Sequence, residues 1–390
     1  MARNGQPRLR LTRLKLTNWR NFQSAEVRLA KRAFFIGPNA AGKSNLLDAV
    51  RFLRDLVKPI AGGFGTALEL RNGLSAVRCL QARRVNYVDI DADVGNEDNA
   101  AVWSYRIRFT RFGRESFPTV EEEVIKHNGA EVGGQRRTKS VADPFLFSQS
   151  VIQQATKQSQ FRELVDFFNS IRYLHVVPQI VRDPRRAFGK GEDPFGGDLL
   201  RRVNETAARS REARLKRIAE ALAIAVPQFA DLRLQHDSEG RPHLEAGFKH
   251  WRPNLSYQTE EVFSDGTLRL IGFLWSLAEK DGPLLLEEPE LSLHADVVRQ
   301  LPAMIARMQR DSGRQVIMTT HSDALVGADG IGMHEVHLLI PSENGTTIET
   351  AAANQQVRQL VESGLSVGEA VMPLARPKGV EQLPLFDVAN

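Results

Sequence analysis

Cysteine is almost absent from this sequence of 390 residues, since Cys79 is its only one. A single thiol cannot form a disulfide framework within the chain, and it cannot supply the paired cysteines of a zinc site. No stretch approaches the ~18 apolar residues that a membrane-spanning helix needs, and the basic start of the sequence lacks the apolar segment of a secretory signal. These absences predict a cytoplasmic protein with no membrane partner.

An excess of one charge is also missing, because 52 Lys and Arg stand against 47 Asp and Glu, a net charge of +5. So mild a value does not by itself require a nucleic-acid partner. Within residues 182–217, however, eleven basic residues stand against six acids. This segment is a candidate for non-specific contact with DNA phosphates, with residues 133–140 (GGQRRTKS) as a candidate extension. A solvated helix face with interleaved acids is the alternative.

What the sequence does have is a glycine-rich turn, GPNAAGKS, between an apolar run and a segment with apolar residues at helical spacing. It fits the P-loop pattern G-x-x-x-x-G-K-[ST], in which backbone N–H groups surround a triphosphate, the Lys bridges the β- and γ-phosphates and the Ser binds Mg²⁺. An ordinary strand-to-helix turn without a ligand is the alternative. The expected phosphate contacts are Gly37, Pro38, Asn39, Ala40, Ala41, Gly42, Lys43, Ser44 and Asn45.

Two adjacent acids, Glu287 and Glu288, follow the apolar run PLLL. Adjacent carboxylates at the end of a buried strand repel each other unless a cation lies beside them, so Glu287 is expected to hold Mg²⁺ and Glu288 to polarise the attacking water. His321 follows another apolar strand, QVIMTT, and is a candidate contact of the γ-phosphate. A solvated acidic pair and a structural histidine are the alternatives.

Taken together, these motifs resemble those of ABC-type ATPases of the SMC, RecF and OLD branch, a group of predicted AAA-type ATPases. The stretch LTRLKLTNWRNFQSAEVRL resembles the opening strands of that family, which places Arg20 and Asn21 where nucleotide contacts are expected. FSDGTLRLIGFLWSL resembles the signature motif, which implies that Ser264, Asp265, Gly266 and Thr267 face the γ-phosphate held by an opposite subunit. EEPELSLH and TTHS resemble the segments that carry the acids and the switch histidine.

The resemblance covers residues 8–55 and 255–340 and departs from the family pattern in two places. Glu287 replaces the commoner Asp, and the signature is S-D-G-T in place of S-G-G-Q. A Q-loop is not evident, and Gln149 is only a candidate for it.

The fold expected from this resemblance is α/β, a P-loop NTPase with an ABC-ATPase-like mixed sheet, an antiparallel β subdomain and a helical insert. ATP and Mg²⁺ are the implied cofactors, and a homodimer or higher oligomer with ATP between the subunits is the implied assembly. The expected domains are the N-terminal half of the ATPase core at 1–60, an antiparallel β subdomain at 61–142, a helical and basic insert with a hairpin at 143–254, the C-terminal half of the core at 255–350 and a tail at 351–390.

The insert lacks the sustained heptads of long SMC arms, and the residues after His321 contain no acid cluster typical of a TOPRIM nuclease. Standalone ATPases of this kind resemble the ATP-sensing halves of bacterial anti-phage defence systems, which implies a separately encoded effector such as a TOPRIM-like or HNH nuclease. A RecF-like DNA-binding accessory of repair or replication is the alternative. A transporter subunit is less consistent with the antiparallel insert and the S-D-G-T signature.

Residues 382–386 (QLPLF) resemble the pentapeptide by which bacterial replication and repair proteins bind the sliding clamp. Leu and Phe side chains would fill an apolar pocket while Gln bonds its rim. The alternative is a terminal segment that docks on its own fold or on another partner.

Overall fold

The computed structural model describes residues 8–60, 62–82, 85–112, 117–137, 147–154, 158–183, 192–279, 282–377, 379 and 381. The chain forms two compact units, and each is described by itself. The first consists of Met1–Arg172, Asp281–Leu285 and Gly313–Asn390, and the second of Tyr173–Lys280 and Leu286–Ser312.

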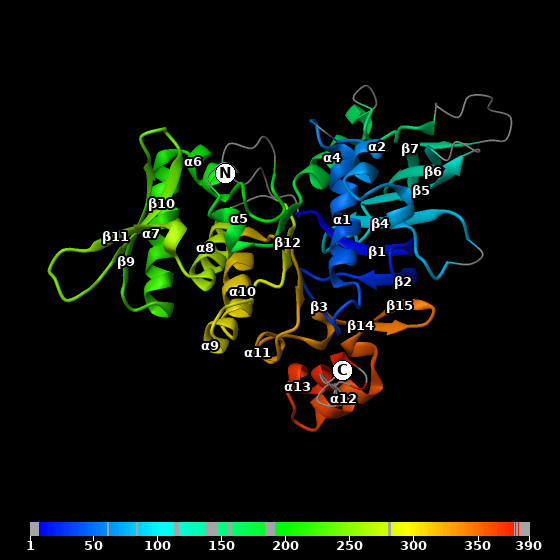
Figure 1. The fold of residues 1–390 in the computed structure, drawn as a ribbon. Helices are drawn as coiled ribbons and strands as arrows, with labels where there is room; N and C mark the ends of the chain where they lie inside the picture. The colour runs from blue at the N-terminus through cyan, green and yellow to red at the C-terminus, as the bar shows by residue number, and fades with distance from the viewer. Residues whose placement is uncertain are drawn as a thin grey trace, which may run out of the picture. The chain divides into compact units, whose positions relative to one another are not determined.

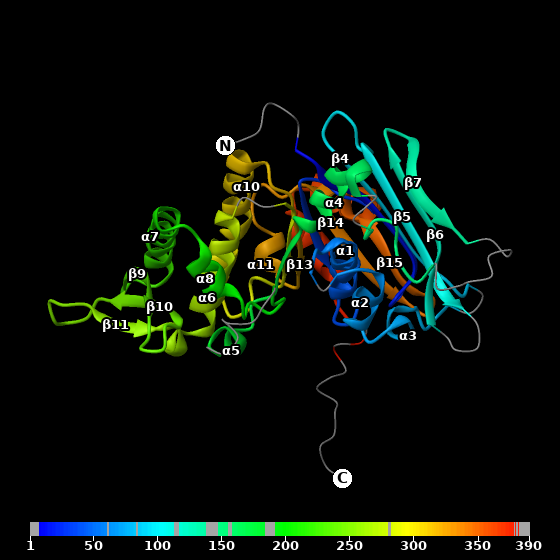
Figure 2. The ribbon, with the colours of Figure 1, turned by 90° about the horizontal axis from the view of Figure 1, so that it is seen from above.

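An antiparallel sheet of six strands forms one part of the first unit, in the order β2-β1-β4-β5-β6-β7. The apolar alternation of residues 8–29 predicts a hairpin, and β1 and β2 do pair antiparallel, with Leu14 opposite Val27. The meander predicted over residues 85–128 is also present, and Figure 2 shows β5 and β6 side by side. The strands are β1 (Arg10–Trp19), β2 (Phe22–Arg28), β4 (Val88–Gly95), β5 (Trp103–Phe112), β6 (Phe117–His127) and β7 (Ala130–Arg136).

A second sheet contains β3, the strand that leads into the glycine-rich turn, and β3 runs parallel to both of its neighbours, β13 and β14. Residues 33–36 of β3 are all buried, as is typical of a parallel strand covered on both faces. The order of its strands is β15-β14-β3-β13-β12-β8. The first unit contains only residues 284–285 of β12 and residue 172 of β8, and the rest of these two strands belongs to the second unit. The strands are β3 (Arg32–Ile36), β8 (Arg172–Leu174), β12 (Leu284–Glu287), β13 (Val316–Thr320), β14 (Val336–Ser342) and β15 (Gly345–Thr350).

Helix α1 (Lys43–Val57) follows the glycine-rich turn and packs on the antiparallel sheet. Its Phe52 ring lies 5.4 Å from the ring of Trp19 and 5.5 Å from that of Phe109, centroid to centroid. The core between helix and sheet is therefore aromatic. The other helices of this unit are α2 (Phe64–Glu69), α3 (Leu74–Val77), α4 (Arg162–Asn169), α11 (Asp323–Val326), α12 (Gln355–Glu362) and α13 (Val367–Val371), labelled where there is room in Figure 1.

The sequence predicts a loosely ordered tail from about residue 364, and this prediction is wrong for residues 366–375. They form α13 and a 3-10 turn, Met372–Ala375. Ser366 Oγ accepts from the backbone N–H of Glu369, whose carboxylate accepts from the N–H of Ser366, so a capping box starts the helix. The clamp-like segment 382–386 lies outside the described residues.

The second unit combines helices with a three-stranded sheet in the order β11-β10-β9, drawn in green in Figure 1. Helix α7 buries Leu215, Ile218 and Leu222, the apolar face expected from the helical spacing in this segment. The elements are α5 (Pro178–Val181), α6 (Leu199–Glu205), α7 (Ala208–Ala225), β9 (Phe229–His236), β10 (Pro242–Phe248), β11 (Ser256–Thr259), α8 (Asp265–Ala278), α9 (Ala295–Val298) and α10 (Leu301–Ser312).

The single helix predicted over residues 294–311 is two helices, α9 and α10. Pro302 is the second residue of α10. Because proline has no N–H, it cannot donate to the carbonyl four residues earlier, and the helix starts anew at Leu301.

Candidate nucleotide site

The glycine-rich turn joins β3 to α1, as the sequence predicts. Gly42 has φ +96°, and a Cβ built on it would lie 2.1 Å from Asn21 Nδ2, so only glycine fits there. Lys43 is buried, and its Nζ donates to the carbonyl oxygens of Gly37 at 3.0 Å and Pro38 at 3.1 Å. The first turn of α1 carries no acid, so its N–H groups face a site suited to an anion.

Asn21 holds this turn from the first hairpin. Its Nδ2 donates to Ala41 O at 2.8 Å and to Thr346 Oγ1 at 2.7 Å, while its Oδ1 accepts from Asn45 Nδ2 at 2.8 Å. One side chain therefore connects the hairpin, the glycine-rich turn, α1 and β15.

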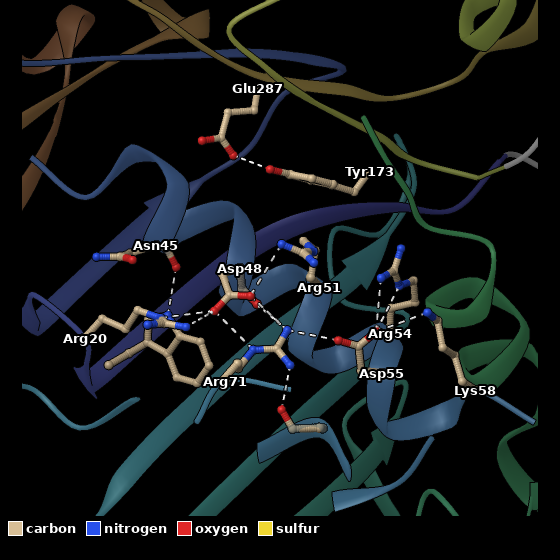
Figure 3. A network of polar contacts seen from close by, with 12 residues as sticks. Arg20, Asn45, Asp48, Arg51, Arg54, Asp55, Lys58, Arg71, Tyr173 and Glu287 are labelled. Atoms are coloured by element: carbon tan, nitrogen blue, oxygen red, sulfur yellow. Dashed lines mark hydrogen bonds and ion pairs between the residues drawn. The ribbon is translucent and has the colours of Figure 1, made fainter. Parts of the chain in front are cut away.

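Arg20 lies beside α1 and pairs with Asp48 at 2.8 Å. Figure 3 shows that the Asp48 carboxylate also meets Arg71, which reaches on to Asp55 at 3.0 Å. Asp48 is the first acid of α1, and paired cations compensate the charge it would otherwise present near a bound phosphate. The contact of Arg20 and Asn21 with a nucleotide stays a prediction.

His321 follows β13 and is exposed, and its Nδ1 lies 3.5 Å from Lys43 Nζ. The structure thus brings together the lysine and the histidine that the sequence places 278 residues apart. A cavity of about 250 Å³ adjoins both motifs; it is lined by Ile36, Gly37, Pro38, Asn39, Thr320, His321, Met372, Ala375, Arg376 and Pro377.

The two adjacent acids lie in the second unit, where β12 ends at Glu287. The Tyr173 hydroxyl donates to Glu287 Oε2, as Figure 3 shows, and His175 Nδ1 lies 3.2 Å from the backbone oxygen of Glu287. Glu288 has φ +43°, a conformation that costs energy for a residue with a Cβ and that clusters at functional sites. Tyr173 thus fixes the carboxylate that is predicted to hold Mg²⁺, while Ser44, the other predicted ligand, is exposed at the start of α1 in the first unit.

The signature residues form the N-terminus of α8. Exposed Ser264 caps the helix, because its Oγ accepts from Thr267 N at 3.2 Å and lies 2.8 Å from Thr267 Oγ1. A Cβ on Gly266 would lie 2.5 Å from Ser292 O, so the signature packs closely on the loop that follows the paired acids.

Sequence reasoning missed Arg182 and Arg269 as parts of this site. Arg182 Nη2 donates to Asp265 Oδ1 at 2.7 Å and to Phe263 O at 2.6 Å. Burial lowers the pKa of Arg269, although the charges of Asp265, Glu288 and Glu290 oppose that shift. Arg269 lies four residues after Asp265, and this helical spacing was a signal that could have found it.

The described part of the predicted DNA segment, residues 182–183 and 192–217, offers fewer outward cations than its composition implies. Five of its arginines make contacts inside the chain: Arg182 with Asp265, Arg201 with Glu205, Arg202 with Glu279, Arg211 with the backbone oxygens of Asn204 and Thr206, and Arg214 over the ring of Trp275. Arg209, Lys216 and Arg217 are exposed. Within the described residues of this segment, a DNA contact would depend mainly on those three side chains.

Gln149, the candidate for a Q-loop, is exposed, and its backbone oxygen accepts from Gln135 Nε2 at 2.6 Å. Among the described side chains there is no group of three or more His, Cys, Asp or Glu residues arranged to hold a metal ion. No helix in the part of the chain that the structure describes is long and apolar enough to cross a bilayer.

Comparison with solved structures finds the fold of SMC head domains. The chain matches an Smc head bound to the C-winged helix domain of ScpA, with a TM-score of 0.55 at 15% identity over 87% of this chain and 96% of the other. An Smc head with an extended coiled coil from Pyrococcus furiosus, bound to the C-terminal domain of ScpA, gives 0.54 at 13% identity, covering 91% and 99%. An Smc head with a coiled coil and joint from Pyrococcus yayanosii gives 0.50 at 12%, covering 91% and 100%.

No curated protein matches the sequence. Residues 32–327 match the family described as "AAA domain, putative AbiEii toxin, Type IV TA system". Because this match spans most of the chain, the chain belongs to this AAA family, and its fold is that of SMC head domains.

Proposed function

We propose that the chain binds ATP with Mg²⁺ and hydrolyses it. The observation that carries this proposal is the position of Lys43 Nζ, which is held by two carbonyl oxygens of the glycine-rich turn and lies 3.5 Å from His321. An ammonium group, a helix N-terminus without acids and a left-handed Gly42 fit the phosphates of a nucleotide.

The proposed ligands of Mg²⁺ are Ser44 and Glu287, whose hydroxyl and carboxylate oxygens are of the kind that this ion binds. Bound Mg²⁺ would supply positive charge that offsets the charge developing on the phosphates. Glu288 is the proposed general base, which accepts a proton from the attacking water. His321 is proposed to donate a hydrogen bond to the terminal phosphate, and Arg20 and Asn21 to contact the nucleotide.

The signature residues are proposed to act in a homodimer. Ser264, Asp265, Gly266 and Thr267 carry too little positive charge to hold ATP alone, so they would complete the site of an opposite subunit across a two-fold axis. The exposed cap of α8 and the ion pair of Asp265 with Arg182 present this motif in a fixed conformation, which supports the proposal.

We further propose that nucleotide-dependent dimerisation controls a separately encoded effector, such as a TOPRIM-like or HNH nuclease, in an anti-phage defence complex. The family description names a putative toxin of a type IV TA system, which supports a role in such a system. A RecF-like accessory of DNA repair or replication is the second candidate, and the exposed cations Arg209, Lys216 and Arg217 favour it.

The test is to express tagged Glu288→Gln with its native neighbouring genes and to purify it with ATP and Mg²⁺ present. The variant should retain ATP in a dimer while turnover falls by roughly a hundredfold or more, the usual contribution of a general base. Bound nucleotide, mass and phosphate release are the measurements. A neighbour-encoded nuclease in stoichiometric amount would support the effector, whereas a dimer that carries only DNA or the sliding clamp would favour the RecF-like function.

Lys43→Ala is the matched control, because it removes the ammonium group at the phosphates and should bind no ATP and stay unassembled. Wild-type turnover by Glu288→Gln would exclude its proposed role as general base.

A further inference from the structure

The cavity beside the glycine-rich turn has a wall that no nucleotide-binding motif supplies. Met372, Ala375, Arg376 and Pro377, which follow α13, line it together with residues of the turn and His321. The whole cavity lies within the first unit.

The lining of this cavity is suited to an anion. Among the described residues that line it, Arg376 is the only permanently charged side chain and none is a carboxylate, and the Lys43 ammonium lies 3.5 Å from the lining residue His321. Arg376 is exposed, so its guanidinium can meet a ligand without first being desolvated by the protein.

The chain holds this wall in place through the element that follows His321. Helix α11 starts two residues after His321 and is capped by Gly327. A Cβ on Gly368 of α13 would lie 2.4 Å from Gly327 N, so the two helices approach as closely as glycine permits. Buried Val371 and Ala375 anchor the stretch that leads to Arg376. The backbone that carries Arg376 is therefore anchored to the element that follows His321.

We propose that Arg376 binds the terminal phosphate of the nucleotide held by the same chain. This inference rests on the proposed function, because it presumes ATP at the glycine-rich turn. The turn's first residues, Gly37 to Asn39, and His321 line the cavity, and His321 is the proposed contact of the terminal phosphate. Arg376 is then a binding residue of the site, and it distinguishes ATP from ADP because only ATP places a phosphate there.

The experiment measures equilibrium binding of ATP and ADP, with Mg²⁺, to full-length wild type, Arg376→Gln, Arg376→Lys and Arg358→Gln. Loss of one charge-assisted hydrogen bond should raise the Kd for ATP by about tenfold in Arg376→Gln and leave the Kd for ADP within about twofold. Arg376→Lys keeps the charge and should lie between wild type and Arg376→Gln. Arg358 is an exposed arginine of α12 outside the cavity lining, and Arg358→Gln should bind as wild type does.

Unchanged ATP binding in Arg376→Gln, or an equal loss for ATP and ADP, would overturn the assignment of Arg376. Thermal melting of the nucleotide-free variants identifies any that are unfolded. If Arg376→Gln is unfolded, the Kd values of Arg376→Lys are compared with those of the wild type in its place. The proposed function fails separately, if the wild type binds no ATP or if Lys43→Ala binds it as well as the wild type does.

Discussion

His337 is a fully buried imidazole on β14 that stacks on Phe35 at a centroid distance of 4.9 Å. Its Nδ1 lies 3.1 Å from Thr350 Oγ1. Burial, with a smaller effect of nearby His334, lowers the pKa of His337 to about 4 from an ordinary value of 6.5. The folded protein therefore keeps this group neutral under conditions in which the unfolded chain protonates it.

The sign of the resulting pH dependence follows from that shift. Above pH 6.5 neither state binds the proton and the stability is complete; below it the unfolded state binds more protons, so stability falls until the pH passes about 4. At pH 5.5 the loss from His337 should be about 1.4 kcal/mol, since one pKa unit corresponds to 1.36 kcal/mol.

Denaturant unfolding at pH 7.5 and pH 5.5 measures this effect. His337→Gln keeps a polar partner for Thr350 but does not titrate, so it should lose less stability than wild type between the two pH values by about that amount. His250→Gln, at an exposed histidine, is the control and should follow the wild type. Identical pH dependence in wild type and His337→Gln would rule out this role of the imidazole.

Residues of the site could be predicted from the sequence where they belong to one continuous motif. The glycine-rich turn occupies eight consecutive residues, and its pattern predicts the strand before it and the helix after it that the structure has. Partners distant in sequence could not be predicted this way. Tyr173 meets Glu287 across 114 residues, and Arg182 meets Asp265 across 83. Nothing in the composition of residues 182–217 distinguishes Arg182, which is paired, from Arg209, which is exposed.

Helix α1 is attached to the segment after α2 by buried charges rather than by apolar contact alone. Arg71 is almost fully buried and reaches both Asp48 and Asp55 of α1 (Figure 3). Burial alone would raise the pKa of Asp55, but the charges of Arg54, Arg71 and Lys58 outweigh it and hold that pKa below its ordinary value. The Asp55 carboxylate consequently depends on these cations to remain charged inside the protein.

Replacing Arg71 by Leu removes the cation that the two buried carboxylates share. The free energy of unfolding should fall by about 2–4 kcal/mol, because Asp48 and Asp55 each lose a charge-assisted hydrogen bond while Arg20 and Arg54 stay beside them. Arg51→Leu is the control on the same helix: Arg51 is partly exposed and lies 3.8 Å from Asp48, so its loss should cost under about 1 kcal/mol. Urea unfolding measures both, and equal losses would show that the buried pairing of Arg71 adds nothing.

Helices and strands could be predicted where a periodic pattern is long and uninterrupted. The hairpin predicted over residues 8–29 corresponds to β1 and β2, and the helix that the apolar spacing predicts over residues 266–280 corresponds to α8, each to within a few residues. The prediction fails where one residue or one cap decides the outcome. Pro302 divides residues 294–311 into two helices, and the capping box of Ser366 and Glu369 starts α13 in a stretch whose Gly and Pro content favours a loop.

The motifs of the proposed site are divided between the two units of the molecule. The glycine-rich turn and His321 belong to the first unit, and Glu287, Glu288 and the signature at Ser264 belong to the second. If ATP is held between two subunits, each site takes its glycine-rich turn from one subunit and its signature from the other. This arrangement predicts that two inactive variants can restore activity to each other.

The two variants are Lys43→Ala, which should lose the phosphate contact, and Ser264→Arg, which should block the signature at the exposed cap of α8. Each alone should be inactive. In a mixed dimer one site carries both substitutions, whereas the other combines the intact glycine-rich turn of one subunit with the intact signature of its partner. Only a mixed dimer offers an intact site at which ATP can join the two subunits, and one of its two sites is intact, so ATP turnover should recover to at most roughly half of wild type at equal mixing.

Phosphate release after mixing, over a series of ratios of the two proteins, measures this recovery. The control mixes Lys43→Ala with a protein that carries both substitutions; such a dimer contains no intact glycine-rich turn and should stay inactive. If each subunit held and hydrolysed ATP alone, mixing would restore nothing at any ratio. Recovery that peaks near equal amounts would instead assign the signature of one subunit to the nucleotide of the other, because only a shared site depends on both proteins at once.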